Sequence, residues 1–137
     1  MVVAAVDPNK VALELGPVAL QAGFQHLDTA QGYNNQEATA EFLDKHDPDH
    51  KLFVTTKLST PDGKPDKGPV AYSEIRPKIL ETIKILGRQP DVFMVHNPFL
   101  TESIAELWKI LDQMIDDGEL TADLGIVSHT PPRPRLT

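Results

Sequence analysis

Four residues whose types could form an acid–base site are spread along the sequence. Asp28, Lys57 and His96 each stand near the end of a short apolar segment, and Tyr33 follows Asp28 closely. A tyrosine is a weak acid at neutral pH, because its ordinary pKa is about 10, but a nearby ammonium group lowers that pKa. Asp28 would hold Lys57 charged and oriented, and His96 would donate a hydrogen bond to a carbonyl oxygen or assist proton transfer. Together, these side chains would protonate an oxygen as negative charge develops on it.

The elements that must position these residues are strands and helices in alternation. Short apolar or β-branched segments with polar C-terminal ends are typical of strands buried on both faces. Helical periodicity fills the segments between them, which predicts an α/β fold with right-handed βαβ units and a parallel sheet. The predicted strands are Phe24–Ala30, Lys51–Leu58, Asp91–Asn97 and Thr121–Val127, and the predicted helices lie near Lys10–Ala22, Gln36–Lys45, Ser73–Leu86 and Thr101–Ile115.

The expected sheet would gather the four candidate residues. Ligands of parallel α/β sheets bind beyond the C-terminal ends of the strands. The first three strands place Asp28, Lys57 and His96 at that end, so we expect them to converge with Tyr33. Taken singly, each residue also has an ordinary structural interpretation, such as a turn cap for the aspartate or a satisfied, partly buried position for the histidine. The four together favour a site.

The two clearest helices each carry an apolar stripe at helical spacing. Gly87 and Gly118 are their predicted stops. Thr101 is predicted to open the second helix, with Glu102 in its first turn. Pro77 is compatible with the first helix if it lies in the first turn, where amides need no intrahelical acceptor. The stripes, which we expect to pack in the core, are Ile75, Ile79, Ile83 and Leu86, and Ile104, Leu107, Trp108, Leu111 and Ile115.

Length and composition bound the fold and the partners. The 137 residues fit one domain but fall far short of the roughly 250 residues of a complete (β/α)8 barrel. The net charge of −7 argues against nucleic acid or acidic membrane as a partner, although a phosphate-bearing ligand needs only local donors. The absence of cysteine excludes disulfides, thiolate nucleophiles and zinc knuckles.

The remaining segments predict no further domain. Residues 1–129 are expected to form a single domain, followed by a proline-rich extended tail at 130–137. Met1–Val6 is apolar but lacks a basic leader, so no signal peptide is expected, and no stretch is long enough to span a bilayer. A cytoplasmic location is the simplest expectation. No metal is expected either, because the proline and the polar setting of His46–His50 favour a solvated loop.

Three strings in the sequence resemble signatures of the aldo-keto reductases. They are Gly-Phe-Gln-His-Leu-Asp-Thr-Ala-Gln-Gly-Tyr at 23–33, Val-Thr-Thr-Lys at 54–57 and Val-His-Asn-Pro at 95–98. The stretch Asp116–Leu120 also resembles the family's approach to its next strand. The resemblance runs from about Ala19 to Ser128 with order and spacing preserved.

This resemblance implies a partial TIM-type barrel and a carbonyl reductase. Tyr33 would donate a proton to a small aldehyde or ketone while NADPH delivers hydride to the carbonyl carbon. The residues that take the places of the family's catalytic tetrad are Asp28, Tyr33, Lys57 and His96, and those that would lie near the substrate or cofactor are Thr29, Asn97 and Ser128.

The sequence departs from the family pattern in ways that concern the cofactor. Its four predicted strands correspond to the second to fifth of the family's eight, and the later segments that hold most of NADPH are missing. The family's Gly-x-Ser-Asn is replaced by Gly-Ile-Val-Ser-His at 125–129, and the glutamate expected directly after Tyr-x-Asn is displaced to Glu37. A half barrel leaves apolar faces and strand edges unpaired, so we predict a homodimer or higher oligomer, in which two copies supply eight strands around a two-fold axis.

Three functions therefore remain open, and an oxidoreductase is favoured. The first is NADPH-dependent reduction, with cofactor contacts rebuilt by dimerisation. The second is a cofactor-independent acid–base enzyme, such as a dehydratase, isomerase or cyclase of a biosynthetic pathway, that uses Tyr33, Lys57 and His96. The third is an inactive truncated member. Cofactor binding separates the first from the second, and loss of activity in Tyr33→Phe separates both from the third.

Overall fold

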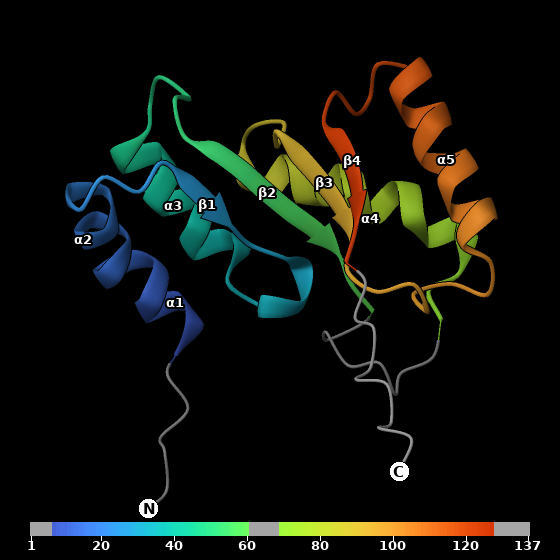
Figure 1. Ribbon diagram of the computed structural model, residues 1–137, viewed down its shortest axis with the longest axis horizontal. Coiled ribbons are helices and arrows are strands. Elements are labelled where there is room, and N and C mark those ends of the chain that lie inside the picture. Colours follow the sequence, from blue (N-terminus) through green and yellow to red (C-terminus); the bar gives the residue numbers. More distant parts are fainter. Residues whose placement is uncertain (1–6, 61–68, 128–137) are drawn as a thin grey trace, which may run out of the picture.

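The sheet has four parallel strands arranged in the order of the sequence (Figure 1). A computed structural model describes residues 7–60 and 69–127, so the predictions for Met1–Val6, for Ser128 and for the tail at 130–137 lie outside the described residues. All neighbouring strands pair in parallel, which confirms the predicted α/β sheet, although each strand begins later than predicted. The strands are β1 (His26–Asp28), β2 (Phe53–Leu58), β3 (Val92–Val95) and β4 (Asp123–Ile126).

Helices precede and connect the strands. In Figure 1, α3 and α4 lie behind the sheet, while α1 and α2 lie beside β1 and α5 lies at the opposite end of the molecule. The helical elements are α1 (Pro8–Lys10), the π-helix η1 (Val11–Leu15), α2 (Gly16–Gln21), the 3₁₀ turn η2 (Gln31–Tyr33), α3 (Gln36–His46), α4 (Tyr72–Leu86) and α5 (Ile104–Asp116).

The N-terminal helical segment begins earlier than predicted and changes type along its length. Asp7 caps it, because its carboxylate accepts a hydrogen bond from a first-turn amide at 3.0 Å. The segment widens into the π-helix η1 just before Pro17, whose missing N–H interrupts the α-helical ladder. Gly16 lets this segment approach α3 closely, since a Cβ there would come within 2.5 Å of the Phe42 ring.

Helix α4 holds its proline deeper than predicted. The helix begins at Tyr72, so Pro77 lies beyond the first turn, and its missing N–H deprives the Ser73 carbonyl of its usual intrahelical donor. The first-turn explanation for Pro77 is therefore wrong. The predicted stop is confirmed, because Gly87 adopts a φ of 69° and its N–H donates to the Lys84 carbonyl.

Helix α5 begins later than predicted, and its buried face is turned accordingly. Ser103 is the cap, since its hydroxyl accepts from a first-turn amide at 3.4 Å, whereas Thr101 is buried and donates to the Ser103 carbonyl. The expectation that Thr101 caps the helix with Glu102 in its first turn is wrong. Met114 is fully buried, while Ile115, which is predicted to lie in the apolar stripe, is 39% exposed.

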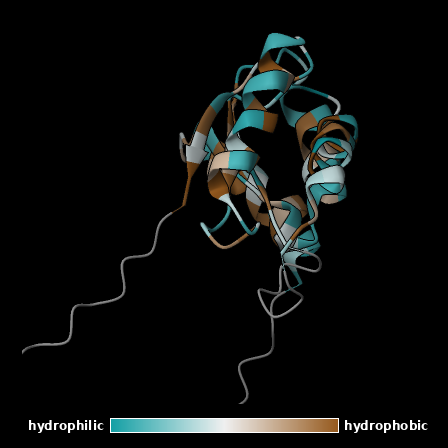
Figure 2. Cartoon of the chain, turned by 90° about the vertical axis from the view of Figure 1, so that its right-hand side faces the viewer, coloured by the Kyte–Doolittle hydropathy of each residue, from teal (hydrophilic) through white to brown (hydrophobic). Residues whose placement is uncertain are grey.

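The core lies between the sheet and the helices. A larger cluster of buried side chains joins β2, β3 and the approach to β4 with α4 and α5, and Trp108 packs against it as predicted. A smaller cluster joins β2 with α3. Figure 2 shows helices that carry both hydrophilic and hydrophobic residues, as expected for helices that bury only one face. Within the described residues, no helix combines the length and the apolar character needed to cross a bilayer.

The other face of the sheet is only partly covered by the described residues. In β3, Val92 and Met94 alternate with buried residues, and Phe53, the first residue of β2, is 44% exposed. Gly125 shares this face, because a Cβ there would meet the Met94 side chain at 3.3 Å. Such a face lines the interior of a closed (β/α) barrel. The chain therefore forms part of a barrel wall.

The loop before β2 is less solvated than predicted. Asp47 is 6% exposed, and its carboxylate accepts hydrogen bonds from the Lys51 amide at 2.7 Å, the Leu52 amide at 3.0 Å and Arg88 at 2.8 Å. Burial raises the pKa of Asp47, but the hydrogen bonds from the two amides and from Arg88 outweigh it, so the pKa lies below its ordinary value of 3.8. The expectation of a solvated loop at His46–His50 is wrong for this residue.

Candidate functional site

Lys57 lies at the centre of the site, near the C-terminal end of β2. Its ammonium group donates to a carboxylate oxygen of Asp28, to the Thr29 carbonyl at 3.1 Å and to the Tyr33 hydroxyl oxygen at 3.1 Å. An ammonium group has three N–H donors, so these contacts use all of them. The side chain is only 7% exposed, and a buried charge needs such partners. Lys57 is therefore held in one position.

Tyr33 reaches the site from the η2 turn after β1. Asn34 ends this turn in the left-handed region with a φ of 53°, which directs the chain into α3. The Tyr33 side chain is exposed, and its ring meets the His96 ring edge-on, with the centroids 5.6 Å apart and the planes at 82°. Because the Tyr33 oxygen accepts a hydrogen from Lys57, its own O–H hydrogen points away from Lys57.

The structure brings the four predicted residues together at the end of the sheet where the C-termini of the strands lie. Asp28 comes from β1, Lys57 from β2 and His96 from the position directly after β3, and the C-terminal ends of these adjacent parallel strands meet there (Figure 1). The Asp28 side chain is 52% exposed, so the cluster is open to solvent on one side. The arrangement is a phenol with an ammonium group behind it and an imidazole ring beside it.

Known proteins resemble this chain in sequence and in fold. The chain matches the Aldo/keto reductase family over residues 6–130. It belongs to that family. It is 28% identical over 119 residues to an uncharacterized oxidoreductase of Schizosaccharomyces pombe. The aligned region covers 82% of this chain and 39% of that protein. It is 29% identical over 128 residues to the methylglyoxal reductase DkgB of Escherichia coli O157:H7. This aligned region covers 90% of this chain and 45% of that protein.

A solved structure supports the same fold. An aldo/keto reductase from Brucella melitensis is similar with a TM-score of 0.71 and 24% identity, over 89% of this chain and 45% of that one. The predicted partial barrel of four parallel strands with flanking helices is confirmed. The chain spans less than half the length of these three proteins.

Two further polar residues, Gln31 and Ser59, frame this cluster of side chains. Gln31 accepts a hydrogen bond from the Ser59 amide at 3.0 Å and donates to the Thr82 hydroxyl of α4 at 2.8 Å. Ser59 accepts one from the Gly32 amide at 3.1 Å, and its Oγ lies 2.7 Å from Nδ1 of His96. In the sequence, the position of Ser59 two residues after Lys57 was the available signal that it could lie near the cluster. Gln31 had none, because its partners are distant in sequence.

The residues predicted to lie near a substrate or cofactor have structural contacts of their own. Thr29 is buried, and its hydroxyl donates to the Asn35 side chain at 3.2 Å. The Asn97 side chain accepts a hydrogen bond from the Phe99 amide at 3.0 Å, which forms an Asx-type turn. Contact of either residue with a ligand remains a prediction, and Ser128 lies outside the described residues.

The donors of the site suit a carbonyl oxygen better than a phosphate. Sites for dinucleotide phosphates use cationic side chains or uncapped helix amides, and Lys57 already has three partners. The N-termini of α3 and α4 have no side-chain cap, so their amides are available to an anion, but the described residues at the strand ends add no cationic side chain for the phosphates of NADPH. Nor does any group of three or more histidine or acidic residues in the described part of the chain suit a metal ion. No lysine or arginine occurs among the described residues that follow the strands, which are 29–35, 59–60, 69–71, 96–103 and 127.

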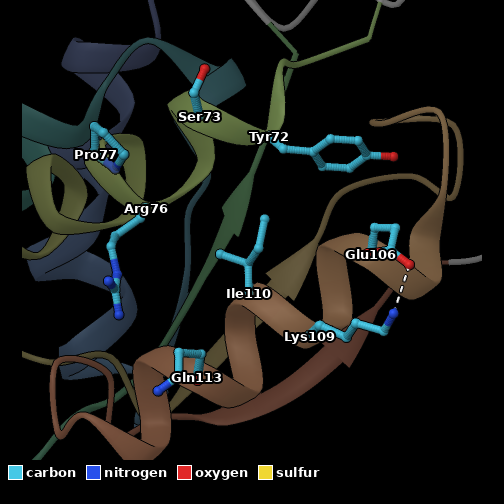
Figure 3. A pocket seen from close by; sticks show the side chains of 8 residues that line it. All are labelled: Tyr72, Ser73, Arg76, Pro77, Glu106, Lys109, Ile110 and Gln113. Atoms are coloured by element: carbon cyan, nitrogen blue, oxygen red, sulfur yellow. Dashed lines mark hydrogen bonds and ion pairs between the residues drawn. The ribbon is translucent and has the colours of Figure 1, made fainter.

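A groove of about 640 Å³ lies elsewhere, between α4 and α5 (Figure 3). Its charged side chains already have partners, because Lys109 contacts Glu106 at 2.7 Å and Arg76 contacts both Asp117 and Glu119. Hydrogen bonds from Gln113 and Arg76 lower the pKa of Asp117. Helix residues line the groove, whereas the acid–base group lies at the strand ends. The groove is therefore not where that group would act.

Proposed function

We propose that this chain takes part in the reduction of a small aldehyde or ketone, with Tyr33 as the proton donor to the carbonyl oxygen. The contact that carries the proposal is the 3.1 Å hydrogen bond from the Lys57 ammonium to the Tyr33 oxygen. A cation at that place stabilises the negative charge that Tyr33 acquires when its proton leaves. The name of the Escherichia coli relative, a methylglyoxal reductase, supports a small carbonyl compound as the substrate.

Each residue then has a defined part in proton transfer. The Tyr33 hydrogen, which points away from Lys57, would bond to the carbonyl oxygen and follow the charge that develops there. Asp28 and the Thr29 carbonyl hold the Lys57 ammonium against the phenol oxygen. His96, whose ring packs on Tyr33, would give the same carbonyl oxygen a second hydrogen-bond donor.

A reduction also needs a hydride donor, and NADPH is the donor that the sequence resemblance implies. The described residues provide the group that meets the carbonyl oxygen but no cationic site for the phosphates. Cationic contacts to the phosphates would have to come from outside the described residues. A calorimetric titration with NADPH tests this part of the proposal independently. Saturable binding would support it, and no binding at millimolar NADPH would contradict it.

Replacing Tyr33 by phenylalanine tests the proton-donor assignment. We expect Tyr33→Phe to lower the rate of NADPH oxidation with carbonyl substrates by about 10²- to 10⁴-fold, the usual contribution of an acid–base group. The chain contains a second tyrosine, Tyr72, whose hydroxyl accepts the Ser103 amide at 2.9 Å and lies outside the site. Tyr72→Phe is therefore the matched control and should keep its activity. Equal activity in the wild type and in Tyr33→Phe would refute the assignment.

A cofactor-independent acid–base reaction is the second candidate function. It is favoured by one observation, the absence of lysine and arginine from the described residues that follow the strands. Such an enzyme would exchange hydrogen at the carbon next to a carbonyl group without NADPH. Proton NMR of carbonyl compounds in D₂O would detect this exchange, and its loss in Tyr33→Phe would assign it to this site. Exchange that persists in Tyr33→Phe would exclude the site as its source.

We further propose that a second copy of the chain completes the barrel. In a (β/α) barrel each helix packs against two neighbouring strands. Around a two-fold axis along the barrel axis, β4 of one copy would lie beside β1 of the other, and the N-terminal helical segment of each copy would cover its partner's β4. Apolar side chains on both surfaces support this, since Leu15 is 57% exposed, Val18 58%, Phe24 67% and Ile126 37%.

Light scattering after size-exclusion chromatography tests the dimer. We expect a dimer for the wild type and a monomer for Val18→Glu, because a charge would be buried at the interface. The control is Leu80→Glu on α4, where another exposed leucine lies away from both surfaces. A monodisperse wild-type monomer would contradict the proposal.

The cytoplasmic location likewise remains a prediction, which microscopy of the tagged protein would test.

A further inference from the structure

Ser59 connects two groups of the site that lie on different strands. Its hydroxyl oxygen accepts a hydrogen bond from the Gly32 amide at 3.1 Å and lies 2.7 Å from Nδ1 of His96. Gly32 directly precedes Tyr33, so one oxygen contacts both the turn that carries the phenol and the imidazole beside it. Ser59 itself is 3% exposed, and its amide is held by the Gln31 side chain at 3.0 Å.

The donors and acceptors around Ser59 determine where its hydrogen goes. A serine hydroxyl has one hydrogen to donate and two lone pairs to accept with. The Gly32 amide is a donor and occupies one lone pair. Among the described residues, the acceptor within hydrogen-bond distance of the Ser59 oxygen is Nδ1 of His96. If the buried hydroxyl group uses its hydrogen within the described residues, it donates that hydrogen to Nδ1.

This assignment fixes the tautomer of the imidazole. A neutral histidine carries its hydrogen on one nitrogen and accepts with the other. If Nδ1 accepts from Ser59, the ring hydrogen is on Nε2, and His96 presents an N–H donor on the opposite edge of the ring. Such a donor would suit a carbonyl oxygen placed next to Tyr33.

We propose that Ser59 is a positioning residue that fixes His96 as the Nε2–H tautomer and couples the His96 ring to the turn that carries Tyr33. Its importance for catalysis rests on the proposed carbonyl chemistry, but the tautomer itself does not. We do not assign Ser59 as a nucleophile, because it is 3% exposed and its oxygen contacts both the Gly32 amide and His96.

Nitrogen NMR of the histidine rings in the full-length protein tests the tautomer without any substrate. The protonated and unprotonated nitrogens of a neutral imidazole have widely separated shifts, and His96→Asn identifies the His96 signals. We expect the wild type to show Nε2–H, Ser59→Ala to shift the His96 signals toward a mixture of tautomers, and Ser59→Thr, which keeps the hydroxyl, to restore them. A wild-type ring protonated on Nδ1, or His96 signals that do not change in Ser59→Ala, would overturn the proposal.

Thr56→Val is the matched control for loss of a buried hydroxyl group. Thr56 lies on the same strand and is fully buried, but its hydroxyl has no hydrogen-bond partner among the described residues. We expect His96 signals and kcat like those of the wild type in this variant. In Ser59→Ala we expect kcat to fall about 10-fold, less than the roughly 10²-fold or more that loss of an acid–base group costs, with little change in KM. If the wild type reduces no carbonyl compound, the NMR result still decides the role of Ser59.

Discussion

The two ends of the sheet each hold a buried cation beside a carboxylate, but only one of the two clusters is open to solvent. At the C-terminal end, Lys57 contacts Asp28, whose side chain is 52% exposed. At the N-terminal end, Arg88 contacts Asp47 at 2.8 Å, and these side chains are 7% and 5% exposed. The ion pairs are similar in chemistry. They differ in what else surrounds the two charges.

The surroundings suit one cluster to stability and the other to chemistry. Asp47 accepts the amides of Lys51 and Leu52, so its carboxylate joins the start of β2 to the end of α4 through Arg88. In the other cluster the third partner of the cation is the Tyr33 hydroxyl, a group that can release a proton and is exposed. In (β/α) barrels the N-terminal ends of the strands serve stability and the C-terminal ends carry the active site.

Removal of the cation at the C-terminal end should have the largest effect, and it should fall on activity. Lys57→Met leaves Tyr33 without the charge that stabilises its phenolate, so we expect carbonyl reduction to fall by about 10⁴-fold, the upper range for acid–base groups. The fold should survive, because Asp28 is left with access to solvent. Lys51→Met, at an exposed lysine that contacts Asp49, is the control in the same assay. Activity above one tenth of the wild type in Lys57→Met would break the contrast between the two ends.

Removal of the cation at the other end should act on stability instead. Arg88→Met leaves the Asp47 carboxylate buried without its cation, which costs about 3 kcal/mol of unfolding free energy. Urea denaturation followed by circular dichroism measures the loss. The kcat per folded molecule should stay within about two-fold of the wild type, because no atom of this cluster contacts the site. A selective loss of kcat with unchanged stability would reverse the roles that we assign to the two ends.

The sequence alone predicted the open cluster better than the closed one. The alternation of strand and helix patterns placed Asp28, Lys57 and His96 at the ends of adjacent strands, and parallel pairing then brings strand ends together without further information. Arg88 and Asp47 were not predicted as a pair. They come from loops far apart in sequence, and a polar loop such as His46–His50 has no pattern that shows which of its carboxylates is buried.

Boundaries were also predicted less well than elements. The shift of the α5 cap from Thr101 to Ser103 depends on one side chain that turns inward, because Thr101 is buried and uses its hydroxyl on the Ser103 carbonyl. Ser59 was missed for a related reason. Its role depends on the distance between its oxygen and a nitrogen of His96, which directly follows β3, and only the folded sheet sets that distance.

The pH dependence of stability should identify the closed cluster. Because hydrogen bonds outweigh burial and lower the folded-state pKa of Asp47, the unfolded chain binds the proton first as the pH falls. The contribution of Asp47 is fully present above pH about 4 and is lost as the pH falls through the lower, folded-state pKa. We expect Asp47→Asn to be less stable at neutral pH and to lose less stability between pH 4 and pH 2. Asp49→Asn is the exposed control. Urea denaturation at each pH measures the free energy of unfolding of all three proteins. If this free energy falls in parallel with pH in the wild type and in Asp47→Asn, Asp47 is not the source of the pH dependence.

The smallest effect should come from a buried polar group that belongs to neither cluster. Thr56 lies on β2 between the two ends of the sheet, is fully buried, and its hydroxyl has no partner among the described residues. Thr56→Val keeps the shape of the side chain and removes the unpaired group, so we expect the free energy of unfolding to rise by about 1 kcal/mol. Thr55→Val is the comparison, because the Thr55 hydroxyl contacts the His26 ring at 2.8 Å and its loss should destabilise the protein. The buried carboxylate of Asp47 stabilises the fold because its hydrogen bonds are made. A loss of stability in Thr56→Val would contradict this prediction. It would indicate that the Thr56 hydroxyl also has a hydrogen-bond partner, one outside the described residues.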